Sequence, residues 1–346
     1  MATDEEQQLA AQFRIDPADQ ALVGPQGAWA AASTCDGRIF LWPCDHDSDE
    51  PPCCSAALAH SGPATGFTMD WDRMWSISCG GADMLVAVVD HVAQRKMARI
   101  KDDEPMNLKE RNYTCIDGSF QAGQYAVGLT DGVIKIGDLE VGKLVDKVRA
   151  HRPRPRDLNK ADIQGIKADW DLKQIVSCAW DRCVSICDTR SNKWVRSLSL
   201  KGHGDTVEQV DVDFQSQQAL TVGTEHKFIH WDLASGKAIK ELPGPGRIAY
   251  DVSVDWRTMR AATAHDCGTV RIWDLDSNVM TSSLDCGGCD EQIQVLDVDW
   301  ERQWLLTGSW ENKTRLIDLK TGRCLKDFQE FATRPNTCVA LKKDSR

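Results

Sequence analysis

The stretch from Val254-Asp255-Trp256 through RTMRAATAHDCGT to Val270-Arg271-Ile272-Trp273-Asp274-Leu275 decides how this chain folds. It holds two short apolar runs, AAT and VRIWDL, on either side of the turn-forming residues His265–Gly268. A third run, Tyr250–Val254, precedes them and alternates apolar with polar residues. Short alternating runs separated by Gly and Asp are typical of antiparallel strands. The stretch therefore predicts consecutive strands of one antiparallel sheet.

The same pattern recurs along the chain in seven units, spaced between 42 and 50 residues apart. Each unit ends in two residues that occupy an equivalent position: Trp42-Pro43, Val89-Asp90, Gly137-Asp138, Cys187-Asp188, Trp231-Asp232, Trp273-Asp274 and Ile317-Asp318. An acidic residue stands six positions before this ending in six of the seven units. An aspartate–aromatic pair lies twelve or thirteen residues further back in five of them. Three features that keep their register along a chain indicate a repeat fold built from stacked units.

The repeat resembles that of the WD-repeat family, and the resemblance covers roughly residues 18–342. Trp231-Asp232 and Trp273-Asp274 carry the full Trp-Asp ending, whereas four units have lost the tryptophan, so the resemblance depends mainly on register. A repeat of this length is typically one four-stranded propeller blade. The resemblance therefore implies an all-β fold: a single seven-bladed β-propeller of four-stranded antiparallel blades, closed by terminal strands.

The WD-repeat family also has a buried network that joins a loop histidine, a turn acid and the tryptophan of the third strand. The residues at those positions in this chain are His60 with Asp83, His151 with Asp181, and His203 with Glu225 and Trp231. The other units lack the histidine, and Cys267 cannot replace the turn carboxylate. We expect these three histidines to be structural rather than catalytic.

The boundaries of the repeat divide the chain into three parts. Residues 1–17 are expected to form a flexible N-terminal arm, residues 18–342 the propeller, and residues 343–346 a C-terminal tail. Such a ring needs a device that joins its first and last blades, because an open edge strand invites aggregation. We expect Cys338–Leu341 to enter the first blade as its inner strand, and the alternative gives that place to Gln20–Val23.

The composition favours protein partners over nucleic acid and membranes. The chain has 346 residues and a net charge of −11, whereas nucleic-acid binders usually present a basic surface. It contains no run of about 18 apolar residues that would predict a transmembrane helix, and the acidic start MATDEEQQLAAQ lacks the pattern of a secretory signal. Fourteen cysteines without such a signal predict reduced thiols and a cytoplasmic, or alternatively nuclear, location.

Two tryptophans outside the repeat register, Trp180 and Trp310, stand directly before the turn acid of their units. In a propeller this turn opens on the same face as the connectors between blades, and exposed tryptophan is frequent at binding hot spots. The Arg-Pro connector after His151 brings Arg154 and Arg156 to that face, where they suit an acidic peptide or a phosphate. We expect partners to dock there. The alternatives are indole rings folded over their own turns and a solvated connector without a ligand.

The sequence offers no catalytic motif. It lacks GxSxG, a P-loop and HExxH. Cys286-Gly287-Gly288-Cys289 has the spacing of only half a zinc site, because a structural zinc needs four ligands. We therefore predict no catalytic residues, no cofactor and no metal.

The expected function is that of a non-enzymatic scaffold or adaptor in a multiprotein complex. A monomeric ring with variable connectors suits the binding of other proteins or peptides. One alternative is a substrate receptor of a cullin-type ubiquitin ligase, since Asp188-Thr189-Arg190 is similar to the Asp-x-Arg ending of propellers that dock on cullin-ligase adaptors. A second is a G-protein β-like signalling scaffold, although the N-terminus shows no coiled-coil heptads. An enzyme is the alternative from a different class.

Overall fold

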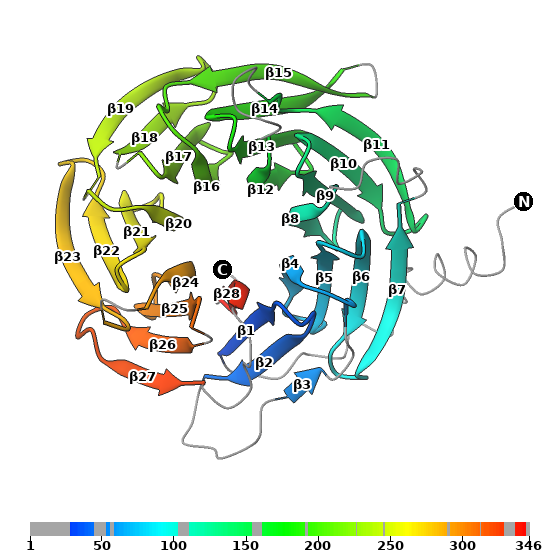
Figure 1. Ribbon diagram of the computed structural model, residues 1–346, viewed down its shortest axis with the longest axis horizontal. Helices are drawn as coiled ribbons and strands as arrows, with labels where there is room; N and C mark the ends of the chain where they lie inside the picture. Colours follow the sequence, from blue (N-terminus) through cyan, green and yellow to red (C-terminus); the bar gives the residue numbers. More distant parts are fainter. Residues whose placement is uncertain are drawn as a thin grey trace, which may run out of the picture.

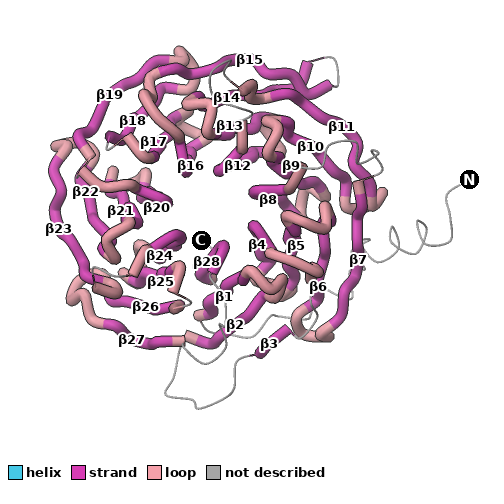
Figure 2. Tube along the Cα trace, viewed as in Figure 1, coloured by secondary structure: helices cyan, strands magenta, loops and turns pink. Residues whose placement is uncertain are grey.

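Seven antiparallel sheets form a closed ring around a central axis (Figure 1). Each sheet has four strands, which confirms the predicted seven-bladed β-propeller. The computed structural model describes residues 28–44, 53–55, 59–102, 111–153, 161–190, 193–225, 227–244, 246–288, 291–311, 313–328 and 336–343. Figure 2 shows that strands and turns build these ranges. Within them, no helix has the length and apolarity needed to cross a membrane.

In blades 2 to 7 the strands follow one another in chain order from the axis to the rim, whereas blade 1 takes its inner strand from the C-terminus. Blade 1 consists of β28 (Asn336–Leu341), β1 (Trp29–Thr34), β2 (Ile39–Pro43) and β3 (Cys53–Ser55). Blade 2 consists of β4 (Ala64–Asp70), β5 (Trp75–Gly80), β6 (Leu85–Asp90) and β7 (Arg95–Lys101). Blade 3 consists of β8 (Tyr113–Ser119), β9 (Gln124–Leu129), β10 (Val133–Asp138) and β11 (Lys143–Arg149). Blade 4 consists of β12 (Ile163–Asp169), β13 (Gln174–Ala179), β14 (Cys183–Arg190) and β15 (Lys193–Lys201).

The last three blades continue this order. Blade 5 consists of β16 (Val207–Asp213), β17 (Gln218–Gly223), β18 (Lys227–Asp232) and β19 (Lys237–Pro243). Blade 6 consists of β20 (Ala249–Asp255), β21 (Arg260–His265), β22 (Thr269–Asp274) and β23 (Val279–Asp285). Blade 7 consists of β24 (Ile293–Asp299), β25 (Trp304–Ser309), β26 (Thr314–Asp318) and β27 (Cys324–Asp327). The two-residue unit endings therefore close the third strand in every blade except blade 4, where β14 continues to Arg190.

The second strand is the most deeply buried part of each blade. All seven second strands are buried at every position except the first. A strand covered on both faces is expected to be an unbroken run of small or apolar residues, which explains runs such as AAT in β21. The outer strands instead alternate exposed and covered residues, as Lys143–Arg149 does in β11.

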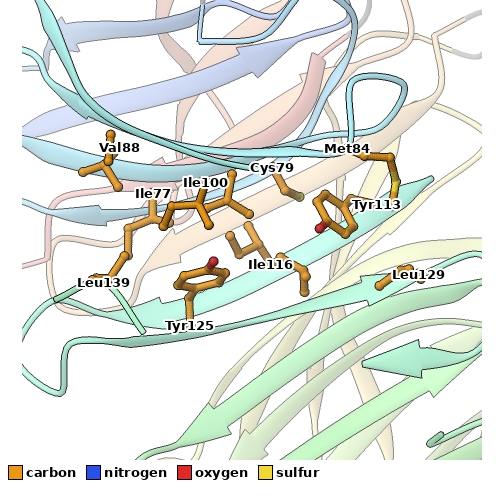
Figure 3. Packing of buried hydrophobic residues seen from close by; sticks show 13 residues of the cluster. Ile77, Cys79, Met84, Val88, Ile100, Tyr113, Ile116, Tyr125, Leu129 and Leu139 are labelled. Atoms are coloured by element: carbon orange, nitrogen blue, oxygen red, sulfur yellow. The ribbon is translucent and has the colours of Figure 1, made fainter. Parts of the chain in front are cut away.

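Apolar clusters between neighbouring blades hold the ring together. The described residues form seven such clusters, one at each interface between blades. Figure 3 shows the cluster between blades 2 and 3, where Ile77 and Ile100 face Ile116 and Tyr125. Burying a large apolar side chain contributes about 1.5–3 kcal/mol. Each blade therefore gains much of its stability from its two neighbours.

Aspartates on four inner strands add hydrogen bonds between blades. In each case a backbone N–H of the next inner strand donates to the carboxylate: Ala168 N to Asp117 at 2.8 Å, Val254 N to Asp211 at 2.9 Å, Leu296 N to Asp251 at 2.8 Å, and Leu341 N to Asp297 at 2.9 Å. These bonds bridge neighbouring sheets that share no strand pairing. They fix the spacing of the inner strands around the axis.

The C-terminal strand closes the ring. β28 pairs antiparallel with β1, with Ala31 opposite Ala340 and Ala32 opposite Val339, and it is the inner strand of blade 1. β28 therefore lies beside the axis in Figure 1. The ring is closed by the predicted segment Cys338–Leu341, and the alternative segment Gln20–Val23 lies outside the described residues.

Candidate binding face

One face of the ring carries the turns between second and third strands together with the connectors between blades, and we call it the connector face. The residue that follows the second strand donates its backbone N–H to the residue just before the inner strand in six blades. The six donors are Gly81, Thr130, Trp180, Thr224, Asp266 and Trp310. The two tryptophans thus occupy equivalent positions, in blades 4 and 7. They share a face but lie three blades apart, so only a partner that spans the axis would contact both.

The three predicted histidine–acid pairs are in contact beneath this face. His60 Nδ1 lies 3.2 Å from Asp83 Oδ2, and His151 Nδ1 lies 2.9 Å from Asp181 Oδ1. His203 Nδ1 contacts Glu225 in the same way. Burial is the largest single influence and raises the pKa of each acid, but the hydrogen bond from the histidine, the charge of the histidine and the hydrogen bonds from backbone N–H groups together outweigh it, so the pKa of all three carboxyl groups lies below the usual value.

A hydroxyl group completes each network, and the sequence reasoning missed it. The second nitrogen of each histidine lies within hydrogen-bond distance of the fourth residue of the second strand. The pairs are His60 with Ser78 at 2.9 Å, His151 with Ser177 at 2.9 Å, and His203 with Thr221 at 2.7 Å. Only in blade 5 does the predicted tryptophan take part, where Trp231 Nε1 donates to the Thr221 hydroxyl at 2.8 Å. The signal for these residues was a Ser or Thr at one fixed strand position.

Blade 6 builds a related network from a histidine that we had not assigned. His265 ends β21, and its Nε2 lies 2.8 Å from the hydroxyl of Thr263. Trp273 Nε1 donates to the same hydroxyl at 2.9 Å. Because Cys267 holds the acid position, His265 Nδ1 instead contacts the carbonyl oxygen of Ile248 at 3.1 Å. Burial lowers the pKa of His265 to about 4.

Trp310 projects from a rigid turn into solvent. Its side chain is 58% exposed. Its backbone N–H donates to Gln292 O at 2.9 Å, and the next residue, Glu311, accepts a hydrogen bond from Gln292 N at 3.0 Å. Ser309 N donates to Lys313 O at 2.9 Å across the turn. Hydrogen bonds therefore join Trp310 and Glu311 to the connector that precedes β24.

The side chain of Trp180 is held more closely against the propeller than that of Trp310. Its residue is only partly exposed, and its indole Nε1 donates to Glu208 in blade 5 at 3.3 Å. Burial raises the pKa of Glu208, and its other oxygen accepts a hydrogen bond from the Thr206 hydroxyl at 2.8 Å. Trp180 thus links blades 4 and 5. This agrees better with the alternative in which the indole ring is folded over its turn than with an indole that projects freely into solvent. Arg154 and Arg156 lie outside the described residues.

The connector face shows no metal-binding arrangement within the described ranges. No three His, Cys, Asp or Glu side chains there are placed to hold a metal ion. Cys286 is buried, with a pKa that burial raises to about 12, and Cys289 lies outside the described residues.

Comparisons with known proteins place this geometry in context. No family model matches the chain. Cross-pathway control WD-repeat protein 2 of Flammulina velutipes is 26% identical over 149 residues, which cover 41% of this chain and 46% of that protein. The curated proteins that this chain resembles include WD-repeat proteins, and the chain has a seven-bladed propeller fold. Its seven units and its His–hydroxyl–Trp contacts agree with that similarity.

Two other relatives match a shorter and a longer part of the chain. Eukaryotic translation initiation factor 3 subunit I of Caenorhabditis elegans is 29% identical over 82 residues, or 24% of this chain and 25% of that protein. Mitochondrial division protein 1 of Aspergillus niger is 26% identical over 250 residues, or 65% of this chain and 34% of that protein. The chain thus spans less than half the length of these curated relatives. The computationally designed Ika8 protein matches 89% of the chain and 86% of its own length, with a TM-score of 0.65 and 16% identity, which shows the fold alone.

Proposed function

We propose that this propeller is a non-enzymatic scaffold that holds proteins together in a multiprotein complex and docks a protein partner on its connector face. The observation that carries the proposal is the exposed, preorganised indole of Trp310. A large aromatic side chain on a fixed turn loses little conformational freedom on binding, which favours affinity. Tryptophan is also enriched among the few residues that dominate interface energies.

The surroundings of Trp310 suit a protein partner. Arg315 and Lys313 both contact the buried carboxylate of Glu291, at 2.8 Å in the case of Arg315 Nη1. Arg315 Nε also lies 3.2 Å from Asp327, so the two cations are balanced by two carboxylates and this cluster needs no further ligand. Two relatives carry names that place them in assemblies or pathways, one as a subunit of a translation initiation factor. Within this proposal the ring acts as a monomer inside a hetero-complex, and Trp180, Arg154 and Arg156 are secondary contacts on the same face.

Affinity purification of the full chain, followed by mass spectrometry and titration of the recovered partner, tests the proposal. Trp310→Ala should weaken the partner's affinity about 30-fold, since truncating a hot-spot tryptophan costs about 2 kcal/mol or more. Its melting temperature should hardly change, because exposed side chains usually contribute within about 0.5 kcal/mol. The matched control is Val92→Ala, which trims a 71% exposed side chain in the turn between β6 and β7 on the opposite face. Unchanged affinity of the Trp310 variant for every partner would place the docking site elsewhere.

A further inference from the structure

The outer strands of the ring divide its rim into a basic part and a neutral part. The three consecutive outer strands β7, β11 and β15 contain ten Lys or Arg residues and one carboxylate, that of Asp146. The other four, β3, β19, β23 and β27, contain three Lys and three acidic residues. Figure 1 shows β7, β11 and β15 side by side along the rim of blades 2 to 4. A chain with a net charge of −11 thus gathers cations along one arc; we call these three strands the basic belt.

The cations of the basic belt face solvent. Nine of the ten are exposed, and the tenth, Lys96, is partly covered. Burial and the neighbouring Arg99 both lower the pKa of Lys96, as expected where cations crowd. Exposed Arg95 and Arg149 each lie 3.8 Å from a carboxylate, a distance at which surface pairs are weak. Lys193 has no ion-pair partner among the residues that the structure describes.

A cleft opens within the basic belt because one hairpin is longer than the rest. β14 has eight residues and β15 has nine, and their pairing continues to Arg190 opposite Lys193. The extension rests on blade 3, where Trp194 N donates to Asp146 Oδ2 at 2.8 Å. The Trp194 ring packs edge-on against Trp170, with centroids 6.2 Å apart. The space left between β11 and this hairpin has a volume of about 410 Å³.

The lining of the cleft combines an apolar floor with cations at its rim. Ile136, Val145 and Trp194 supply the apolar surface, and Lys173 and Lys193 are exposed beside it. No carboxylate in the described ranges lies within salt-bridge distance of either lysine. The carboxylate of Asp146 already accepts backbone hydrogen bonds on both oxygens, from Trp194 and Lys147. The two lysines outweigh this single carboxylate, so the lining of the cleft is net positive.

We propose that the cleft between blades 3 and 4 binds an extended acidic peptide segment of a partner protein. An apolar side chain of the peptide enters the cleft, and carboxylates on either side contact Lys173, Lys193 and the neighbouring cations of the basic belt. The cleft has the size for one or two side chains, not for a folded element. Trp194 is the one aromatic residue of the belt strands; it is only partly exposed and its ring packs edge-on against Trp170, so the belt offers no series of rings on which successive bases would stack, which favours a peptide over single-stranded nucleic acid. This second docking surface goes beyond the proposed function, because the rim is separate from the connector face.

Fluorescence anisotropy with the full chain tests the proposal. The probe is a fluorescein-labelled seven-residue peptide with a central phenylalanine and three acidic residues on either side. We expect saturable binding that weakens with rising salt. The double variant Lys173→Glu/Lys193→Glu should weaken binding by about tenfold or more, and alanine in place of the peptide's phenylalanine should do the same through lost apolar contact. Lys173→Gln/Lys193→Gln should give a smaller loss in the same direction.

The matched control places the same charge change outside the basic belt. Lys237 begins the outer strand β19, and Arg257 lies in the turn between β20 and β21; both are exposed. Lys237→Glu/Arg257→Glu should keep the affinity within about twofold, because exposed charges beyond a Debye length are screened. Trp310→Ala should also bind the probe normally, so a failure of the proposed connector-face function would be distinguishable from a failure here.

Four results would overturn the proposal. The first is unchanged binding by the lysine variants. The second is an equal loss in the control, which would mean that overall charge governs binding. The third is equal or tighter binding of a uridine oligonucleotide, which would make the belt a nucleic-acid surface. The fourth is a tenfold gain in affinity on deletion of residues 1–27, which contain five carboxylates and one arginine and would then be the true occupant.

Discussion

Replacing Thr221 by valine should destabilise the ring by about 2–4 kcal/mol. The Thr221 hydroxyl accepts the indole N–H of Trp231 at 2.8 Å and contacts His203 Nε2 at 2.7 Å. Thr221 and Trp231 are 0% and 1% exposed, so water cannot replace the lost partner. Valine preserves the shape of the side chain and leaves two buried polar groups unsatisfied, each at a cost of about 1–2 kcal/mol, in the lower part of the usual range.

Differential scanning calorimetry at pH 7.5 would measure this loss. An unfolding entropy of about 2.1 cal/mol/K per residue gives about 0.7 kcal/mol/K for the whole chain, so the expected drop in Tm is about 3–6 °C. Thr307→Val is the matched control, because Thr307 holds the same strand position in blade 7. In that blade Ile317 takes the place of the tryptophan near the end of the third strand. Its hydroxyl donates a long 3.4 Å hydrogen bond to Arg315 O. We expect the Tm of the control to drop by less than about 1.5 °C. Equal drops in Tm for both variants would refute the stabilisation assigned to the hydrogen bonds of Thr221 with His203 and Trp231.

Two further predictions concern closure and pH. Deleting residues 337–346 removes β28 and should lower soluble yield and raise aggregation, because β1 becomes an open edge; an unchanged Tm of the truncated protein would contradict this. His91 and His265 have pKa values lowered to about 4 by burial, so the stability of their neutral forms is present above pH 6.5 and is lost as pH falls towards 4. Each should cost about 2 kcal/mol at pH 5 relative to pH 7.5. Urea titrations at several pH values should show that the free energy of unfolding depends less steeply on pH in His265→Gln than in wild type. An identical pH dependence would count against this assignment. Burial raises the pKa of Asp251 to about 7, so its ionisation destabilises the fold in the opposite direction, as pH rises. Because Asp251 is present in both proteins, the comparison with wild type separates the effect of His265 from it.

The repeat could be predicted because its constraints are local. Second strands are covered on both faces, so each must be a short apolar run, and in six blades the third strand begins just after a turn acid. Both demands leave a mark at fixed spacing even where the tryptophan is lost. Blade 3 shows why the ending itself is a weaker signal. Its third strand has Gly137 at the tryptophan position, and a Cβ there would overlap the ring of Tyr125, which is fully buried and fills the space from β9.

The candidate sites could be predicted only in part, because they depend on contacts between units. Register placed Trp180 and Trp310 on equivalent turns, but the hydrogen bond from Trp180 to Glu208 crosses to another blade and leaves no local trace. The cleft beside Trp194 likewise depends on the contact between the long β14–β15 hairpin and blade 3. His265 was missed because it sits at the end of a strand, a position where the family's loop histidine is not expected.

The exposed side chains of the two proposed surfaces differ from those of the propeller core because they do not pack one blade against another. Trp231 and Trp273 belong to clusters that join neighbouring blades, so changing them alters folding and binding at once. Trp310 and Lys193 belong to no such cluster, and both are exposed. Their chemistry can therefore change without cost to the ring, which is the condition for a repeat fold to acquire specific partners. Because one lies on the connector face and the other on the rim, a partner at either surface leaves the other open. A ring with both proposed surfaces would bring two proteins together, as the proposed scaffold function requires.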